Sequence, residues 1–101
     1  MTVVLRASPR RERLQRELGE NIERWRRVNG LSATELADRA AVTRETLRAV
    51  EAGTGAPRLD SVLAILIALG IAEPVVDATN PYNSETARVR IDDILRQAGE
   101  P

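Results

Sequence analysis

The chain has 101 residues, enough for one domain with a modest hydrophobic core. It contains no Cys and no His, which excludes disulfides, thiolate chemistry, His-based metal sites and His-dependent catalytic triads. With one Trp, one Tyr and no Phe, the interior must be aliphatic, and we expect an all-α fold. The longest apolar run, residues 62–72, is too short to span a bilayer, and the first residues do not resemble a signal peptide. We therefore expect a cytoplasmic protein.

The formal net charge is zero, but the charges are unevenly distributed. Residues 1–28 carry eight arginines against four acids, residues 29–59 are balanced, and residues 60–101 carry three arginines against seven acids. All fifteen cations are arginines, whose guanidinium group suits bidentate contacts with phosphate and guanine. Such a polarised chain can present a basic face to nucleic acid and keep an acidic one elsewhere.

The N-terminal part of the chain predicts one long amphipathic helix. Residues 1–7 lack a helical period, so we expect a flexible tail or, alternatively, a strand over Thr2 to Leu5 that pairs with another chain. Ser8 followed by Pro9 is a typical helix start, and Asn29-Gly30 is a typical end. We expect the stripe at helical spacing between them to be buried, with Trp25 in the core: Leu14, Leu18, Ile22, Trp25 and Val28.

The stretch from Leu31 to Gly53 predicts two short helices separated by a tight turn. Ser32 can cap the first helix, with Glu35 completing a capping box, and Thr43 can cap the second. The apolar positions fall on one face of each helix, at Leu36, Ala37, Ala40, Leu47 and Val50. This arrangement is a helix-turn-helix, whose second helix can lie in a DNA major groove.

This stretch resembles the XRE-type helix-turn-helix family, which includes Cro and phage repressors. Further matches follow the stretch at Pro57, Leu59, Leu63, Leu69 and Gly70. Within the stretch, twelve positions fit the family pattern: Leu31, Ser32, Glu35, Leu36, Ala37, Val42, Thr43, Arg44, Thr46, Leu47, Glu51 and Gly53. The resemblance implies a lambda-repressor-like five-helix DNA-binding domain. Two positions depart from the pattern: Ala33 replaces a glutamine, and Ala41 stands where a glycine often adopts a left-handed conformation.

The resemblance also implies roles for individual side chains. The base-reading residues would be Arg44, Glu45, Arg48 and Ala49, at the start of the second helix and one turn later. Glu51 would be a structural acid paired with an arginine such as Arg24 or Arg27. We expect the DNA phosphates to be bound by Ser32, Thr43, Arg27, Asn29, Thr54 and Arg58.

The remainder of the chain predicts three more helices. The first begins at Asp60-Ser61 and ends at Gly70, with Val62, Ile65, Leu66 and Leu69 inward; the second spans about residues 73–78. The third is capped by Ser84 and presents an apolar face from Ala87 to Ala98, after a break at Asn80-Pro81-Tyr82-Asn83. We assign residues 8–79 to the DNA-binding domain and residues 80–101 to a helical extension for packing or dimerisation. Tyr82 is expected to be a core residue at this hinge.

Several functions remain open at this point. We expect a homodimer that reads a pseudo-palindromic operator and regulates transcription as a repressor. Asn80-Pro81-Tyr82, with Arg88 after it, resembles the tail of HipB-like antitoxins, so a HipA-type toxin kinase is an alternative partner. We do not expect an enzyme, because the adjacent carboxylates of Asp92 and Asp93 point about 100° apart on a helix and cannot act as a pair. We expect no metal or cofactor site either.

Overall fold

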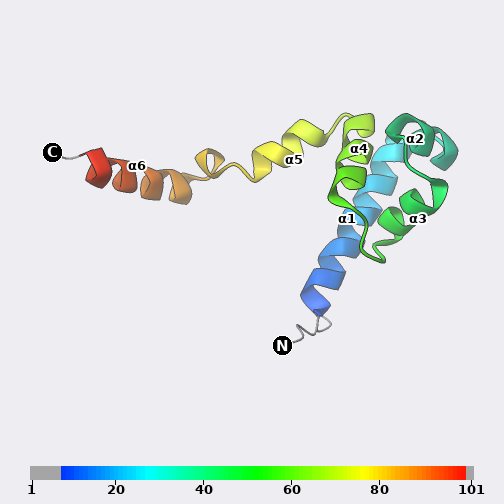
Figure 1. Ribbon diagram of the computed structural model, residues 1–101, viewed down its shortest axis with the longest axis horizontal. Coiled ribbons are helices and arrows are strands. Elements are labelled where there is room, and N and C mark those ends of the chain that lie inside the picture. The colour runs from blue at the N-terminus through cyan, green and yellow to red at the C-terminus, as the bar shows by residue number, and fades with distance from the viewer. Residues whose placement is uncertain (1–7, 100–101) are drawn as a thin grey trace. The chain divides into compact units, whose positions relative to one another are not determined.

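The computed structural model describes residues 8–99, so the tail or strand expected at residues 1–7 lies outside the described residues. It divides into two compact units after Gly70. The first unit contains α1 (Pro9–Val28), α2 (Ala33–Ala40), α3 (Arg44–Ala52) and α4 (Leu59–Leu69); the second contains α5 (Ala72–Ala78), the 3₁₀ helix η1 (Pro81–Asn83) and α6 (Glu85–Gly99). Figure 1 shows these elements. The all-α prediction of five helices followed by a C-terminal helix is confirmed. The domain boundary that we expect after residue 79 stays a prediction.

The predicted capping residues begin the helices of the first unit. The hydroxyl oxygens of Ser8, Ser32 and Thr43 accept hydrogen bonds from the backbone N–H three residues later, at 3.2, 3.1 and 3.0 Å. Each such bond satisfies one of the donors that a helix N-terminus leaves without a partner. The helix predicted to begin at Asp60 begins one residue earlier, at Leu59, with no side-chain cap.

The core of the first unit is aliphatic and draws on all four helices. Its most deeply buried side chains are Ile22, Leu36, Leu47 and Ile65, one from each helix. The predicted inward faces of α2 and α3 are buried, and so are Ile65, Leu66 and Leu69 of α4, whereas Val62 is half-buried. Burying one such side chain contributes about 1.5–3 kcal/mol. The packing partners are α1 with α3 and α2 with α4.

The prediction of which face of α1 is buried is wrong. Leu14, Leu18, Trp25 and Val28 are between 44 % and 75 % exposed, and only Ile22 of that stripe is buried. The buried residues of this helix are Gly19 and Ile22, so its inner face lies to one side of the stripe. Trp25 is therefore not a core residue.

Two glycines explain why α1 turns this face inward. A Cβ added to Gly19 would lie 2.4 Å from the carbonyl oxygen of Val50, and one added to Gly53 would lie 2.5 Å from Cα of Arg16. Real Cβ atoms do not approach so closely, so α1 and α3 pack backbone against backbone at both positions. Gly53 also has φ of 69°, the left-handed conformation expected of it as the C-terminal stop of α3.

The second unit buries little of its apolar surface. Ser84 caps α6 as predicted, accepting from the Ala87 N–H at 3.2 Å, and Asn83 donates its amide to the Asp77 carbonyl at 2.7 Å. None of the side chains of α6 is buried. Tyr82 is 56 % exposed, so the prediction that it is a core residue is wrong. No helix between residues 8 and 99 is long and apolar enough to cross a membrane.

Candidate nucleic-acid interface

The turn between α2 and α3 sets the position of the second helix. Ala41 has φ of 55° and ψ of 41°, and it is the one non-glycine residue with positive φ between residues 8 and 99. The Ala41 N–H donates to the Asp38 carbonyl, and the Val42 N–H donates to the Ala37 carbonyl at 3.0 Å. These bonds end α2 in a left-handed cap and turn the chain sharply into α3. Ala41 thus adopts the left-handed conformation that glycine often takes at this position, at a cost of about 1 kcal/mol for a residue with a Cβ.

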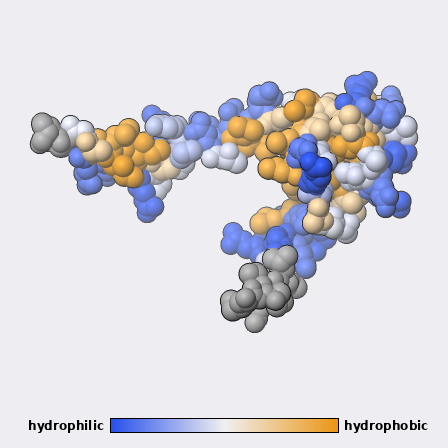
Figure 2. All heavy atoms as spheres, in the orientation of Figure 1, coloured by the Kyte–Doolittle hydropathy of each residue, from blue (hydrophilic) through white to orange (hydrophobic). Residues whose placement is uncertain are grey.

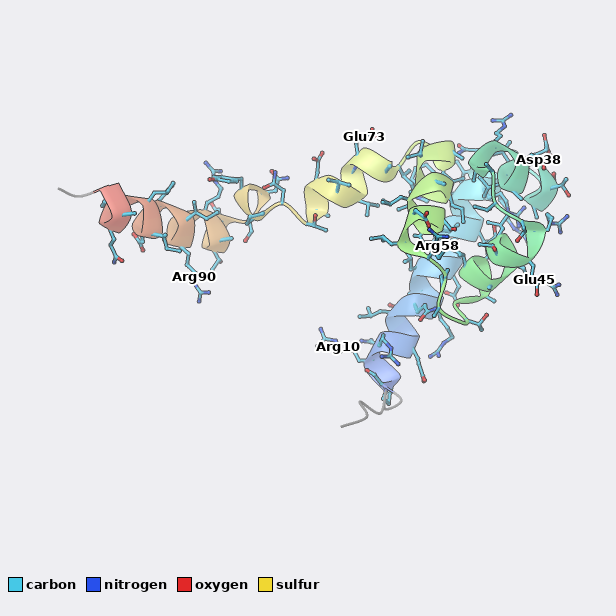
Figure 3. The ribbon with its side chains drawn as sticks, in the orientation of Figure 1. Arg10, Asp38, Glu45, Arg58, Glu73 and Arg90 are labelled. Carbon is cyan, nitrogen blue, oxygen red and sulfur yellow. The ribbon has the colours of Figure 1, made fainter. Side chains whose placement is uncertain are left out.

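The outer face of α3 is polar and open. Arg44, Glu45 and Arg48 are exposed and Ala49 is half-buried, whereas Leu47 and Val50 on the opposite face are buried. In Figure 3, Glu45 points outward from α3. Figure 2 shows hydrophilic residues along the edge of the first unit that α2 and α3 form. The four expected base-reading residues therefore share the outward side of one helix.

Two hollows flank these residues. A hollow of about 300 Å³ is lined by Ala33 of α2 and by Arg44, Arg48 and Glu51 of α3, among others. The second, of about 260 Å³, is lined by Thr43, Glu45, Ala49 and the loop residues Ala56 and Pro57. The two arginines thus lie toward the start of α2, and Glu45 and Ala49 lie toward the loop after α3. Between the hollows, the first two turns of α3 form a ridge.

Arg44 is held by a neighbour on α2. Its guanidinium donates to the hydroxyl of Thr34 at 2.5 Å, a bond that joins the first turns of the two helices. Neither Arg44 nor Arg48 is in an ion pair with any residue in the described range of 8–99. Both positive charges are therefore available to a ligand that approaches from solvent.

The N-terminus of α2 already holds a carboxylate. The Ser32 N–H donates to Glu35 Oε1 at 3.0 Å, and the Glu35 N–H donates to the Ser32 hydroxyl, which confirms the predicted capping box. These hydrogen bonds with Ser32 lower the pKa of the Glu35 carboxyl below its ordinary value of 4.5. At this end of α2 a phosphate would have the backbone N–H groups of Ala33 and Thr34, which no preceding turn can occupy. At α3, Thr43 caps the helix without an adjacent capping carboxylate.

The other four expected phosphate ligands are already hydrogen-bonded within the protein. Arg27 donates to Glu23 at 2.8 Å and Arg58 donates to Asp60 at 3.0 Å, both as exposed pairs. Thr54 donates to the Ala49 carbonyl at 3.5 Å, while Asn29 donates to the Leu69 carbonyl at 3.2 Å and so ties the end of α1 to α4. Exposed ion pairs are worth only about 0–1 kcal/mol, so a phosphate could replace the acids beside Arg27 and Arg58. In Figure 3, Arg58 lies by α4, apart from Glu45.

The structural acid Glu51 is paired with Arg26, so the expected partners Arg24 and Arg27 are wrong. Arg26 donates two hydrogen bonds to the Glu51 carboxylate, at 2.7 and 3.1 Å, and a third to the Leu31 carbonyl. The two side chains are only 13 % and 12 % exposed, and the hydrogen bonds that Arg26 donates to the Glu51 carboxylate raise the pKa of Arg26. The pair fixes α1 to α3, and Arg26 also fixes α1 to Leu31, two residues before α2.

Three residues that position the interface escaped the sequence analysis. Thr34 binds Arg44, Arg26 binds Glu51, and Gln15 donates to the Gly55 carbonyl at 3.0 Å, which anchors the loop after α3. The available signal was the spacing of Gln15, Gly19, Ile22 and Arg26, which fall on one face of α1 at steps of four, three and four. A glycine inside a helix often marks such a close packing contact.

Comparison with protein families supports the interpretation of this geometry. Residues 22–75 match a family described as helix-turn-helix, which covers more than half of the chain. The chain belongs to the XRE-type helix-turn-helix family of DNA-binding regulators, which is not a family of enzymes. Comparison with curated proteins and with solved structures gives no match.

Proposed function

We propose that this protein is a sequence-specific repressor of transcription that reads the major groove of double-stranded DNA with α3. The observation that carries the proposal is the ridge on α3, where Arg44, Glu45 and Arg48 are exposed beside the polar N-termini of two helices. Arg44 or Arg48 can donate two hydrogen bonds to guanine, Glu45 can accept one from cytosine, and Ala49 can contact a thymine methyl. The proposed site of action is the cytoplasm.

The proposed phosphate contacts frame this ridge. The free N–H groups at the starts of α2 and α3, next to Ser32 and Thr43, can bind phosphate oxygens on either side of the groove. Arg27, Asn29, Thr54 and Arg58 are further candidates, of which Asn29 is the weakest because its amide already holds α4. One recognition helix covers few base pairs, so we propose a symmetric dimer with its recognition helices about 34 Å apart on a pseudo-palindrome.

The DNA duplex for the decisive test is obtained by selecting the fragments that the protein binds from its own promoter region. On the selected duplex, Arg44→Ala should weaken binding by about 1–3 kcal/mol and relax the preference at one base pair. The matched control is Arg96→Ala on α6, which removes the same charge from an exposed pair with Asp93 and should leave binding unchanged. Equal losses for both variants, or no binding to any duplex at low salt, would contradict the proposal.

Salt dependence separates base contacts from phosphate contacts. Log affinity should fall linearly with log salt concentration, with a slope of about −0.9 for each neutralised phosphate. Arg58→Ala should make this slope shallower by about one and weaken binding to all sequences alike. Arg44→Ala should change the slope little, because a base contact releases no phosphate counterion.

A second candidate function concerns the second unit. The aliphatic residues Ile94 and Leu95 of α6 are 63 % and 58 % exposed, an unpartnered apolar face that suits binding of another protein. Together with the resemblance of the segment around Tyr82, this favours an antitoxin that neutralises a HipA-type kinase and represses its own operon. Co-purification with a kinase encoded beside the gene, abolished by Leu95→Glu, would support this function. If the kinase binds the variant equally well, the role proposed for α6 is wrong.

A further inference from the structure

The exposed stripe of α1 has the spacing of a coiled-coil seam. Leu14, Leu18, Asn21, Trp25 and Val28 follow one another at steps of four, three, four and three, the repeat that keeps one face of a helix against a second helix. All five side chains are exposed in the structure. Nothing in the packing of the first unit explains this repeat, because the unit is held together through Gly19, Ile22 and Arg26 on a neighbouring face.

We propose that this seam is a dimer interface, and that a second copy of the chain covers it with its own α1 in antiparallel orientation. In an antiparallel pair, Leu14 faces Trp25 of the second copy and Leu18 faces Asn21 of the second copy. The positions that border the open side of the seam are Glu17 and Arg24. In this register Glu17 of each copy lies opposite Arg24 of the other, so the symmetric pair forms two complementary charge contacts.

The parallel arrangement lacks this complementarity. It would place Glu17 beside Ile22 of the second copy, a residue that is 1 % exposed because it belongs to that copy's own core. In the present structure Arg24 donates to Asn21 at 2.9 Å and lies 3.9 Å from Glu20. The ion pair with Glu20 is exposed and therefore weak, so Arg24 can turn to a carboxylate of the second copy at little cost.

The shape of the first unit leaves room for this pairing. In Figure 1 the N-terminal half of α1 projects beyond α2, α3 and α4, and Figure 2 shows hydrophobic residues on this part of the helix. In this register four seam positions of each helix face one another, and such a pairing buries on the order of 800–1,000 Å² in total, at the low end of interface sizes. An interface of this size is typical of weak association, so we expect a dimer that dissociates on dilution.

Trp25 is the one tryptophan of the chain and lies in the seam, so it reports on the interface directly. Sedimentation of the full chain without DNA should show a dimer that dissociates on dilution, and tryptophan emission should shift to longer wavelength over the same range. Leu18→Glu should raise the dissociation constant at least about 30-fold, since it places a carboxylate in the seam. Circular dichroism should remain unchanged, because Leu18 is half-exposed in the first unit.

Charge reversal tests the antiparallel register. Glu17→Arg alone and Arg24→Glu alone should each weaken self-association about tenfold, since each variant faces like charges in its own dimer. Mixing the two variants should restore association as a heterodimer, in which every such contact is again between opposite charges. The control is Arg13→Glu, which lies one turn before Glu17 and farther from the seam, and it should leave association unchanged.

The remaining outcomes overturn the proposal. A monomer at several hundred micromolar, or a dimer that Leu18→Glu leaves intact, would show that a second copy does not cover the seam. A mixture of the two charge variants that stays monomeric would exclude the antiparallel register. Tryptophan emission that is shielded at all concentrations in a monomer would assign the seam to an intramolecular contact. These measurements contain no DNA, so their failure is separate from failure of the proposed DNA binding.

Discussion

The two ways in which helices pack in the first unit are opposite in character. The α2–α3 pair buries its aliphatic residues and leaves its arginines exposed, as an amphipathic helix is expected to do. Helix α1 instead buries Gly19 and Ile22, holds Arg26 in a part-buried ion pair, and leaves Leu14, Leu18 and Trp25 exposed. A helix can thus be fixed by a close backbone approach and one buried ion pair, and its most apolar stripe is then available for another purpose.

Removing the part-buried ion pair between Arg26 and Glu51 should have the largest effect on stability. Glu51→Ala should lower the free energy of unfolding by about 3 kcal/mol, because it leaves the part-buried Arg26 guanidinium without the carboxylate that accepts two of its hydrogen bonds. Urea denaturation measures the loss. The double variant Arg26→Met, Glu51→Leu should recover most of it, since a matched apolar pair leaves no charge to bury. A loss as small as that of an exposed pair would mean that water solvates Arg26.

The close approach of α1 and α3 gives the next largest effect. Gly19→Ala should lower the free energy of unfolding by about 2 kcal/mol, because the added Cβ would collide with the backbone oxygens of Val50 and Glu51. In an open helix the same change would raise stability by about 1 kcal/mol, so the sign of the effect is decisive. Gly99→Ala in α6 is the control, since nothing lies within 4 Å of its added Cβ.

A substitution at Ala41 tests the left-handed conformation of the turn between α2 and α3. Ala41→Gly should raise the free energy of unfolding by about 0.5–1 kcal/mol, because glycine adopts the left-handed conformation without a steric cost. Thermal unfolding of the two proteins measures the gain. The comparison with Ala40→Gly, in the helix and buried, should show a loss instead. A loss at position 41 would mean that Ala41 is not held at positive φ.

The contrast between these regions also explains what could be predicted from the sequence. The helix starts at Ser8, Ser32 and Thr43 and the stop at Gly53 were predictable, because capping depends on residues within one turn. The inner faces of α2 and α3 followed from periodicity, since each helix has only one apolar face to bury. Periodicity failed for α1 because the helix has two candidate faces and a long-range contact, Gly19 against α3, decides between them. The Arg26–Glu51 pair spans 25 residues, so no residue within one turn of Glu51 indicates which arginine is its partner.

The capping box of α2 predicts the smallest effect, a dependence on pH. Because hydrogen bonds with Ser32 lower the pKa of Glu35 in the folded state, its carboxylate stabilises the fold above the unfolded value of about 4.5. That contribution is lost as the pH falls through the lowered pKa. Glu35→Gln should therefore have a lower melting temperature than the parent chain at pH 7, and the difference should shrink below pH 4. A difference that persists in acid would show that the carboxylate charge is not what closes the capping box.

At pH 7 the Glu35→Gln variant also removes the negative charge beside the free N–H groups of Ala33 and Thr34, so it should bind a given duplex slightly more tightly than the parent chain does. Stability and affinity should thus change in opposite directions at this one position, since the carboxylate occupies the end of α2 where a phosphate would bind.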